Sequence, residues 1–361
     1  MSTEELKSLM QRFDSDRSAL DNKQMAIKIL MNSLYGALAN EHFRFYKYEH
    51  AASITLTGQF ALRSIEKTID EELNTLFKTE GEKYLIYIDT DSLYFTLDAA
   101  FKKYNITESA AIKTLEKLSQ EKLAPIVNKI CQACCDYMHS FENRLVFKTE
   151  IAADKGIWIG KKKYVLKAHS SEGVRFAKPK FKAKGLEMVR SSTPQFVRDK
   201  LKNALEIIFE SDEAQTQAYI QGVKTEFLQL PHQAVAFPRG ANNLAEYSSK
   251  TAIYTREKSV PIQVRAALLY NHYLKVYGVD NKYPAIGEGD KLKFLYLKMP
   301  NRLRENVIAF PADGELPAEF GVLDKVDYEA QFDKTFLSSI QIILTAISWQ
   351  AEAKMDLSEF F

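Results

Sequence analysis

The sequence predicts an α+β protein in which helices back an antiparallel sheet. Two long stretches with helical periodicity open the chain, at residues 2–40 and 51–77. Two short β-rich runs, 84–88 and 93–97, follow and are separated by only four polar residues, which is typical of a tight hairpin. More helix and then more β structure come next. This order indicates an antiparallel sheet with helices packed on it.

The elements of the first half follow from their apolar spacing. Residues 51–77 carry an apolar stripe, and residues 107–141 carry a second stripe that suits a helix packed on a sheet. The stripe residues are Ile65, Ile69, Leu73 and Leu76 in the first helix, and Leu115, Leu118, Ile126 and Ile130 in the second. Residues 145–167 have β character, and the glycines at Lys155-Gly156 and in the run 160–163 predict turns.

The second half is predicted to be mostly helical. A capping segment at 191–194 precedes the first of its helices, and a short β run lies at 290–297. Helices are expected at 194–210, 213–228, 261–277 and 328–352. There is no internal repeat, and the pattern changes divide the chain near residues 40 and 185.

Length and composition are those of an ordinary globular protein. The 361 residues are enough for more than one packed core. No run of 18 apolar residues is present, and the first 13 residues lack the apolar core of a signal peptide. We therefore expect a cytoplasmic protein without a membrane span.

Charge is distributed unevenly although the net charge is only +2. Residues 148–184 contain 11 basic and 3 acidic side chains, whereas residues 312–361 contain 3 basic and 10 acidic ones. A basic central stripe predicts a polyanionic partner there, and the acidic tail predicts a different contact.

The three cysteines lie close together in a helical stretch. Cys131, Cys134 and Cys135 are odd in number, which argues against a disulfide framework. His139, four residues after Cys135, could form a zinc site with these cysteines, but the sequence contains no second pair of ligands. Buried thiols are the better interpretation.

Asp89 and Asp91 lie at the expected hairpin tip. Two carboxylates this close repel each other unless a cation lies between them, and their hard oxygens suit Mg²⁺ or Mn²⁺. Sites with two such metal ions catalyse in-line phosphoryl transfer. The alternative is a solvated turn.

A second group of polar residues lies on one face of the first helix. Lys28, Asn32 and Tyr35 fall at i, i+4 and i+7, with Gly36 beside them. A cation, an amide and an aromatic ring can bind a nucleoside triphosphate, and the glycine would let a base pair approach the backbone. The alternative is an amphipathic helix with an exposed polar face.

The run Gly160-Lys161-Lys162-Lys163-Tyr164 is the third group. Lysines next to an aromatic ring can neutralise DNA phosphates and reach a minor-groove acceptor. The alternative is a solvated turn.

These three groups, in this order, resemble motifs of the T-even-phage-like family B replicative DNA polymerases. Residues 28–36 are similar to motif B of the fingers, 89–92 to motif C of the palm, and 161–164 to the lysine-rich minor-groove motif. Further similarity lies at 184–188, 191–194 and 241–245. The resemblance spans essentially the whole chain and implies DNA-directed DNA polymerase activity in phage genome replication, in the cytoplasm of the host cell.

The resemblance also implies a domain layout, with part of a polymerase right hand in one chain. Residues 1–39 would be the C-terminal part of the fingers, 40–185 the palm with its antiparallel sheet, and 186–361 a mostly helical thumb with a C-terminal tail.

Roles at the nucleotide site are implied in the same way. Lys28 would contact the incoming triphosphate, with Asn32 beside it, and Tyr35 and Gly36 would form the surface that checks the nascent base pair. Asp91 would bind both of two Mg²⁺ ions. Lys28 near the leaving group could also act as a general acid.

The remaining roles concern the metal surroundings and the DNA. Asp89 would support the metal site, and Glu150 would be an outer acidic residue. The lysines 161–163 would contact primer-template DNA, with Lys162 probing the minor groove at the primer terminus, and Tyr164 would help to hold the duplex.

The family's motif A, whose aspartate is the other essential metal ligand, is not found in this sequence. The first finger helix and the 3′→5′ exonuclease are not found either. We therefore expect that activity needs an N-terminal polymerase chain that supplies them, either in a split polymerase or because this chain is a truncation. Met1 followed by a capping box at Ser2 and Glu5 favours a split gene.

The last residues resemble the peptide by which replicative polymerases bind a sliding clamp. Leu357, Phe360 and Phe361 would enter an apolar pocket, although Lys354 replaces the usual Gln. The alternative is a frayed tail.

Two other classes of function are open to this sequence. One is a non-catalytic accessory protein that binds DNA and the sliding clamp. The other is a different two-metal enzyme, such as a reverse transcriptase or a nuclease. Reverse transcriptases usually have two adjacent aspartates in their hairpin, whereas Thr90 separates the two aspartates here. Nucleases would need more carboxylates or clustered histidines.

Overall fold

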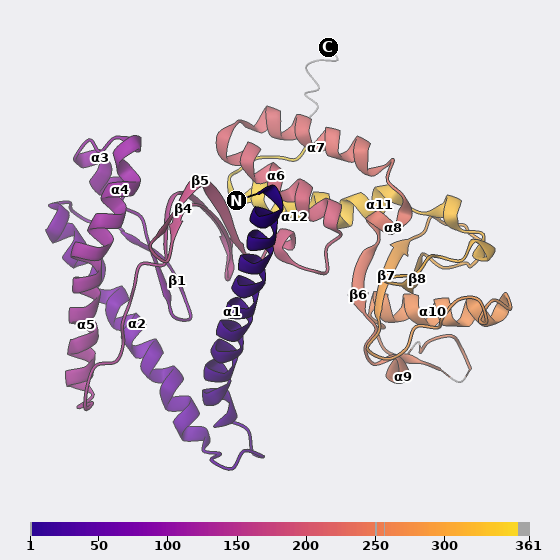
Figure 1. Ribbon diagram of the computed structural model, residues 1–361, viewed down its shortest axis with the longest axis horizontal. Helices are drawn as coiled ribbons and strands as arrows, with labels where there is room; N and C mark the ends of the chain where they lie inside the picture. The colour runs from indigo at the N-terminus through magenta and orange to yellow at the C-terminus, as the bar shows by residue number, and fades with distance from the viewer. Residues whose placement is uncertain (1, 250, 256, 353–361) are drawn as a thin grey trace. The chain divides into compact units, whose positions relative to one another are not determined.

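The computed structural model describes residues 2–249, 251–255 and 257–352 (Figure 1). The chain forms two compact units, Met1–Thr149 and Glu150–Phe361. Helices and antiparallel sheets occur in both, which confirms the predicted α+β class. In the described parts of the chain, no helix has both the length and the apolar character needed to span a membrane.

The first unit opens with two long helices, α1 (Thr3–Ala37) and α2 (Tyr48–Phe77). The capping box predicted at the start of α1 is confirmed: Glu5 N donates to Ser2 Oγ over 3.2 Å, and Ser2 N donates to Glu5 Oε2 over 2.6 Å. Helix α1 buries none of its residues. Helix α2 buries most of its predicted stripe, with Ile65, Ile69 and Leu73 fully buried.

A hairpin follows, made of β1 (Leu85–Asp89) and β2 (Ser92–Phe95), and then the short helix α3 (Asp98–Lys103). The single helix expected over 107–141 is present as α4 (Glu108–Leu118), a π-turn at Ser119–Leu123, and α5 (Ala124–Tyr137).

Helix α5 ends before the predicted residue 141. His139 takes a left-handed conformation with φ of 51°, and Ser140 N donates back to Cys135 O over 3.0 Å. Such a cap usually uses glycine, so a histidine at this position does not indicate a helix end. All three cysteines are buried, as predicted, and Cys131 joins the core formed by α2, α5 and the hairpin.

The second unit begins with a three-stranded antiparallel sheet, β3 (Ile151–Gly160), β4 (Lys163–Ser171) and β5 (Val174–Lys184). The turn predicted at Lys155-Gly156 is wrong, because β3 runs through both residues. Gly156 is needed there for space: a Cβ would lie 2.7 Å from Leu166 Cδ2. Strand β5 was not predicted.

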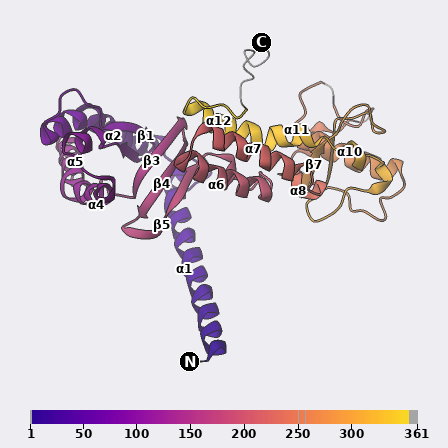
Figure 2. The same ribbon diagram turned by 90° about the horizontal axis from the view of Figure 1, so that it is seen from above.

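Helices α6 (Gln195–Glu210) and α7 (Glu213–Phe227) follow as predicted and lie side by side (Figures 1 and 2). The capping prediction at 191–194 is wrong. Thr193 Oγ1 donates to Glu187 Oε2 over 3.1 Å, and Pro194, which offers no side-chain cap, is the N-cap residue.

The rest of this unit is less helical than predicted. The β run near 290–297 is β7 (Lys291–Tyr296), but it is the centre of a second three-stranded sheet with β6 (Phe237–Gly240) and β8 (Val307–Pro311), which were not predicted. The helices here are α8 (His232–Val235), α9 (Leu244–Tyr247), α10 (Ile262–Val276), α11 (Tyr328–Phe332) and α12 (Ser338–Ala346). Short 3₁₀ or π turns lie at Glu187–Val189, Ala318–Phe320, Leu323–Lys325 and Asp333–Leu337.

The helix predicted to reach residue 352 ends at Ala346. Ser348 has a φ of 63°, and Trp349 N donates to Leu344 O over 2.9 Å, which closes the last turn without a glycine.

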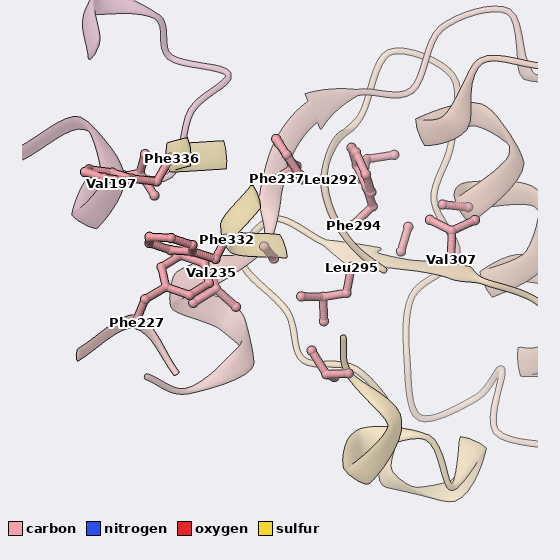
Figure 3. Packing of buried hydrophobic residues seen from close by; sticks show 14 of the residues in the cluster. Val197, Phe227, Val235, Phe237, Leu292, Phe294, Leu295, Val307, Phe332 and Phe336 are labelled. Atoms are coloured by element: carbon pink, nitrogen blue, oxygen red, sulfur yellow. The ribbon is translucent and has the colours of Figure 1, made fainter. Parts of the chain in front are cut away.

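The second core joins the second sheet to α6, α7 and the C-terminal helices. In Figure 3, Phe332 lies against Phe227 while Phe294 and Leu295 extend from the sheet. The rings of Phe227 and Phe332 are 5.4 Å apart in an edge-to-face arrangement, and both residues are buried. Aromatic pairs of this kind fix the helices against one another.

Candidate functional site

The hairpin of β1 and β2 turns within two residues. Asp89 pairs with Ser92, so Thr90 and Asp91 form the tip. Asp91 N donates to Asp89 O over 2.7 Å, and Thr90 has a φ of 59°. A residue with positive φ at such a tight hairpin tip is rare and strained, above all when it is β-branched. Strain of this kind persists where surrounding contacts hold it, often at functional sites.

The two carboxylates at this tip have different surroundings. Asp89 is buried, with 6% of its surface exposed, whereas Asp91 is exposed. Thr90 Oγ1 donates to Asp89 Oδ1 over 3.0 Å, and Ser92 Oγ donates to Asp89 O over 3.0 Å. The hydroxyls therefore fix the buried residue and leave the outer one open to a ligand.

Carboxylate oxygens are the donors that Mg²⁺ and Mn²⁺ prefer, so the chemistry of the pair fits such an ion. Within ranges 2–249, 251–255 and 257–352, no group of three or more His, Cys, Asp or Glu side chains is arranged to hold a metal.

Helix α2 anchors the hairpin through residues that the sequence analysis missed. Asp70 Oδ1 accepts from both Tyr84 N and Leu85 N, each over 3.0 Å. One turn later, Asn74 Nδ2 donates to Glu82 O over 2.8 Å, and Asn74 Oδ1 accepts from Glu82 N over 3.1 Å. The only signal in the sequence is a polar i, i+4 pair beside an apolar stripe, which is too common to single out.

The polar face predicted on α1 is present. Lys28, Asn32 and Tyr35 all lie in one continuous helix and are exposed, so their 3.6-residue spacing places them on one side of it. A Cβ at Gly36 would meet nothing within 4 Å, so the backbone there is open to a close approach. The ligand roles of these residues stay predictions.

Another side of α1 carries large apolar residues exposed to solvent. They recur every seven residues and form what we call the α1 stripe: Leu6, Phe13, Leu20, Ile27 and Leu34. Their exposed fractions run from 48% to 67%. Apolar residues seven positions apart lie near one side of a helix, and an exposed apolar side of this size is typical of a surface that packs against a partner.

The lysine run of the second unit forms the turn between β3 and β4. Gly160 pairs with Lys163, so Lys161 and Lys162 are the turn residues, and all three lysines are exposed. Tyr164 follows on β4 and is buried, with Lys184 Nζ 5.9 Å from its ring centroid.

Glycine is required where this turn meets the end of β5. Gly185 has a φ of 70°, and a Cβ there would overlap the backbone oxygen of Lys162. The turn and the end of β5 are therefore in direct contact.

The sequence matches the model of DNA polymerase family B over residues 2–263. The chain belongs to this family. It is 32% identical to the DNA-directed DNA polymerase of Escherichia phage RB69 over 375 aligned positions, and 30% identical to that of Enterobacteria phage T4 over 370. These alignments cover 100% and 99% of this chain, but 41% and 40% of the relatives.

A more distant relative is the DNA polymerase of Desulfurococcus sp. (strain Tok), at 23% identity over 93% of this chain and 36% of that protein. The family B chain thus spans about two-fifths of the length of its curated phage relatives.

Three residues of the predicted sites fall outside the part of the chain that the structure describes. They are Leu357, Phe360 and Phe361 of the clamp-binding tail. The three-domain division and the individual site roles stay predictions.

Proposed function

We propose that this chain provides part of the active site of a DNA-directed DNA polymerase that replicates a phage genome in the host cytoplasm. Family membership and the similarity to two phage polymerases over essentially the whole chain support this function. The observation that carries it is the strained two-residue turn that presents Asp91 beside the buried Asp89.

In this proposal, the chain's own residues position the reactants. Asp91, with Asp89 behind it, holds divalent cations, and Lys28 and Asn32 hold the triphosphate of the incoming nucleotide. Tyr35 and Gly36 border the nascent base pair. Mg²⁺ supplies charge compensation and activation of the attacking hydroxyl when it is bound. Positioning and charge compensation, not covalent catalysis, would provide most of the rate enhancement.

We also propose that a separate N-terminal chain supplies the remaining parts of the active site. That chain would bring motif A, the first finger helix and the exonuclease. The α1 stripe supports this view, because a 35-residue helix with no buried residue gains little from its own unit and needs a cover for its apolar repeat. A helix packed along the stripe would leave the face of Lys28 free for nucleotide.

Primer extension tests the proposal. This chain and a candidate N-terminal chain would be assayed with Mg²⁺ separately and mixed, and we expect extension only on mixing. In the mixture, Asp91→Asn should lower the rate at least about 1,000-fold, which corresponds to about 4 kcal/mol of barrier. Asp98→Asn, an exposed carboxylate on α3, is the matched control. Full activity of the Asp91→Asn mixture would refute the metal role.

Variants of Lys28 and Lys23 distinguish a specific role of Lys28 in triphosphate binding from a general effect of positive charge on α1. Both are exposed lysines of α1, but they lie on different sides of the helix. Lys28→Ala should weaken triphosphate binding or slow the single-turnover rate, and Lys23→Ala should change neither. If Lys28→Ala also leaves both unchanged, the lysine has no part in binding or in proton transfer.

The sliding clamp is the remaining partner in this proposal, through Leu357, Phe360 and Phe361. Deleting the last two residues should abolish clamp-dependent processivity and leave distributive synthesis intact. Clamp-stimulated synthesis by the deleted chain would exclude this role.

A further inference from the structure

Strand β5 carries four exposed lysines at alternate positions. Three of them have partners in register on β4, and we call these three, Lys180, Lys182 and Lys184, the lysine ladder. Their partners in register on β4 are Ala168, Leu166 and Tyr164. Because side chains alternate along a strand, the three lysines share one face of the sheet, and neighbours in the ladder are about 7 Å apart along the strand. That spacing is close to the distance between successive phosphates of a DNA strand.

The opposite face of β5 belongs to the protein core. Phe181 and Ala183 point the other way and pack against the larger core, and Phe181 meets Phe209 with ring centroids 5.2 Å apart. The ladder is therefore held at a fixed register by buried residues. Strand β5 is also the edge of its sheet, with a neighbour on one side only (Figure 2).

Two ladder lysines crowd each other instead of pairing with acids. Lys180 Nζ and Lys182 Nζ lie 4.7 and 5.9 Å from the centroid of the same ring, that of Phe176. No carboxylate of the described ranges forms an ion pair with either. Two ammonium groups around one ring repel each other, and an anion placed at them would offset that repulsion.

Other lysines of the same sheet have their charge or donors engaged within the protein. Lys167 forms ion pairs with Asp154 and Glu210, and the hydrogen bond to Glu210 raises its pKa. Lys155 Nζ donates to Phe209 O over 2.8 Å. Lys155 and Lys167 therefore have partners within the protein, whereas Lys180 and Lys182 are exposed and share only the ring of Phe176.

The ladder continues into that turn. Lys184 pairs with Tyr164, and Gly185 lies against the backbone of Lys162, so the two groups of lysines adjoin each other.

We propose that the lysine ladder is a further DNA-contacting surface, which follows the sugar–phosphate backbone of one strand of the duplex away from the 161–163 turn. The inference rests on the proposed function and adds residues that the motifs do not contain. It predicts sequence-independent contacts that position the duplex, because ammonium groups on phosphates carry no base information. The alternative is that these lysines only prevent strands of other molecules from pairing with the exposed edge of the sheet.

The salt dependence of DNA binding distinguishes contact with phosphates from protection of the sheet edge. The full chain, and its K180Q/K182Q variant, would be titrated with a fluorescent primer-template duplex between about 50 and 200 mM salt. If both lysines contact phosphates, the slope of log K against log salt becomes less steep by about 1.8, at about 0.9 per contact. The K180R/K182R variant keeps both charges and should retain the wild-type slope.

The matched control is K275Q/K298Q, which removes two exposed lysines of the same unit outside the ladder. It should keep the wild-type slope. An unchanged slope for K180Q/K182Q, with wild-type binding intact, would overturn the ladder and leave the proposed function standing. A wild-type chain that does not bind the duplex either alone or mixed with the N-terminal chain would overturn both. A reduced slope on single-stranded DNA with none on the duplex would also refute the inference.

Discussion

Replacing Asp70 should release the hairpin that carries Asp89 and Asp91. One carboxylate oxygen of Asp70 accepts from two successive backbone amides at the start of β1, each over 3.0 Å. A hydrogen bond to a charged acceptor contributes about 1.5–3 kcal/mol. Because these groups are only partly buried, we take the lower end for each, so Asp70→Ala should lower the free energy of unfolding by about 3 kcal/mol.

Urea denaturation and hydrogen exchange would measure this loss. With a slope of about 2 kcal/mol per molar urea, the midpoint should fall by about 1.5 M. Exchange at the amides of Tyr84 and Leu85 should accelerate, since both lose their acceptor. Asp70→Asn keeps the oxygen and should retain part of the stability.

Glu66→Ala is the matched control, because Glu66 is an exposed carboxylate one turn earlier on the same helix. It should leave the midpoint and the exchange rates near their wild-type values. If Asp70→Ala matched Glu66→Ala in both measurements, the hairpin would not depend on this anchor and the reasoning would fail.

Three further predictions concern the second core, a half-buried histidine and the turn glycines. Phe332→Ala should cost about 3–5 kcal/mol in urea unfolding because it empties a fully packed site, whereas Phe141→Ala, at a 99% exposed position, should stay within about 0.5 kcal/mol. Burial lowers the pKa of His232, so the unfolded chain binds more protons below about pH 6.5 and stability falls as pH drops, by at most about 1.4 kcal/mol per pH unit. His232→Gln should flatten that pH dependence of the urea midpoint, and an unchanged profile would contradict it. Gly185→Ala should cost more than about 2 kcal/mol in thermal unfolding, since it adds a backbone overlap to a left-handed φ. Gly173→Ala, with φ of 80° and open space, isolates the conformational cost, and equal losses would rule out the overlap.

Local rules were sufficient for the elements with strong periodicity. Helix α1, the stripe of α2 and helices α6 and α7 follow from apolar spacing, and Ser2 and Glu5 cap α1 as their sequence pattern predicts. The hairpin was found because two carboxylates interrupt two β-rich runs. Its turn is two residues long instead of four, since Asp89 and Ser92 pair within the strands.

The sequence did not predict elements that are stabilised mainly by contacts with segments distant in the chain. Strand β5 contains Pro179 and alternating lysines, a pattern that reads as solvated until β4 supplies its hydrogen bonds. Gly156 predicts a turn by itself, but it pairs with Leu166 in the ladder of β3 and β4 and is therefore a strand residue. The ends of α5 and α12 use His139 and Ser348 in conformations usually given to glycine.

The sequence by itself determined the family, the helices with strong apolar periodicity and the three groups of polar residues, because each depends on spacing within one segment. Only the tertiary structure decided that Asp70 anchors the hairpin of Asp89 and Asp91 and that the ladder lysines share one face. These facts depend on which segments pack together and in which register. The packing and the register depend on the burial of side chains that are far apart in the sequence, and a pattern within one segment does not contain this information.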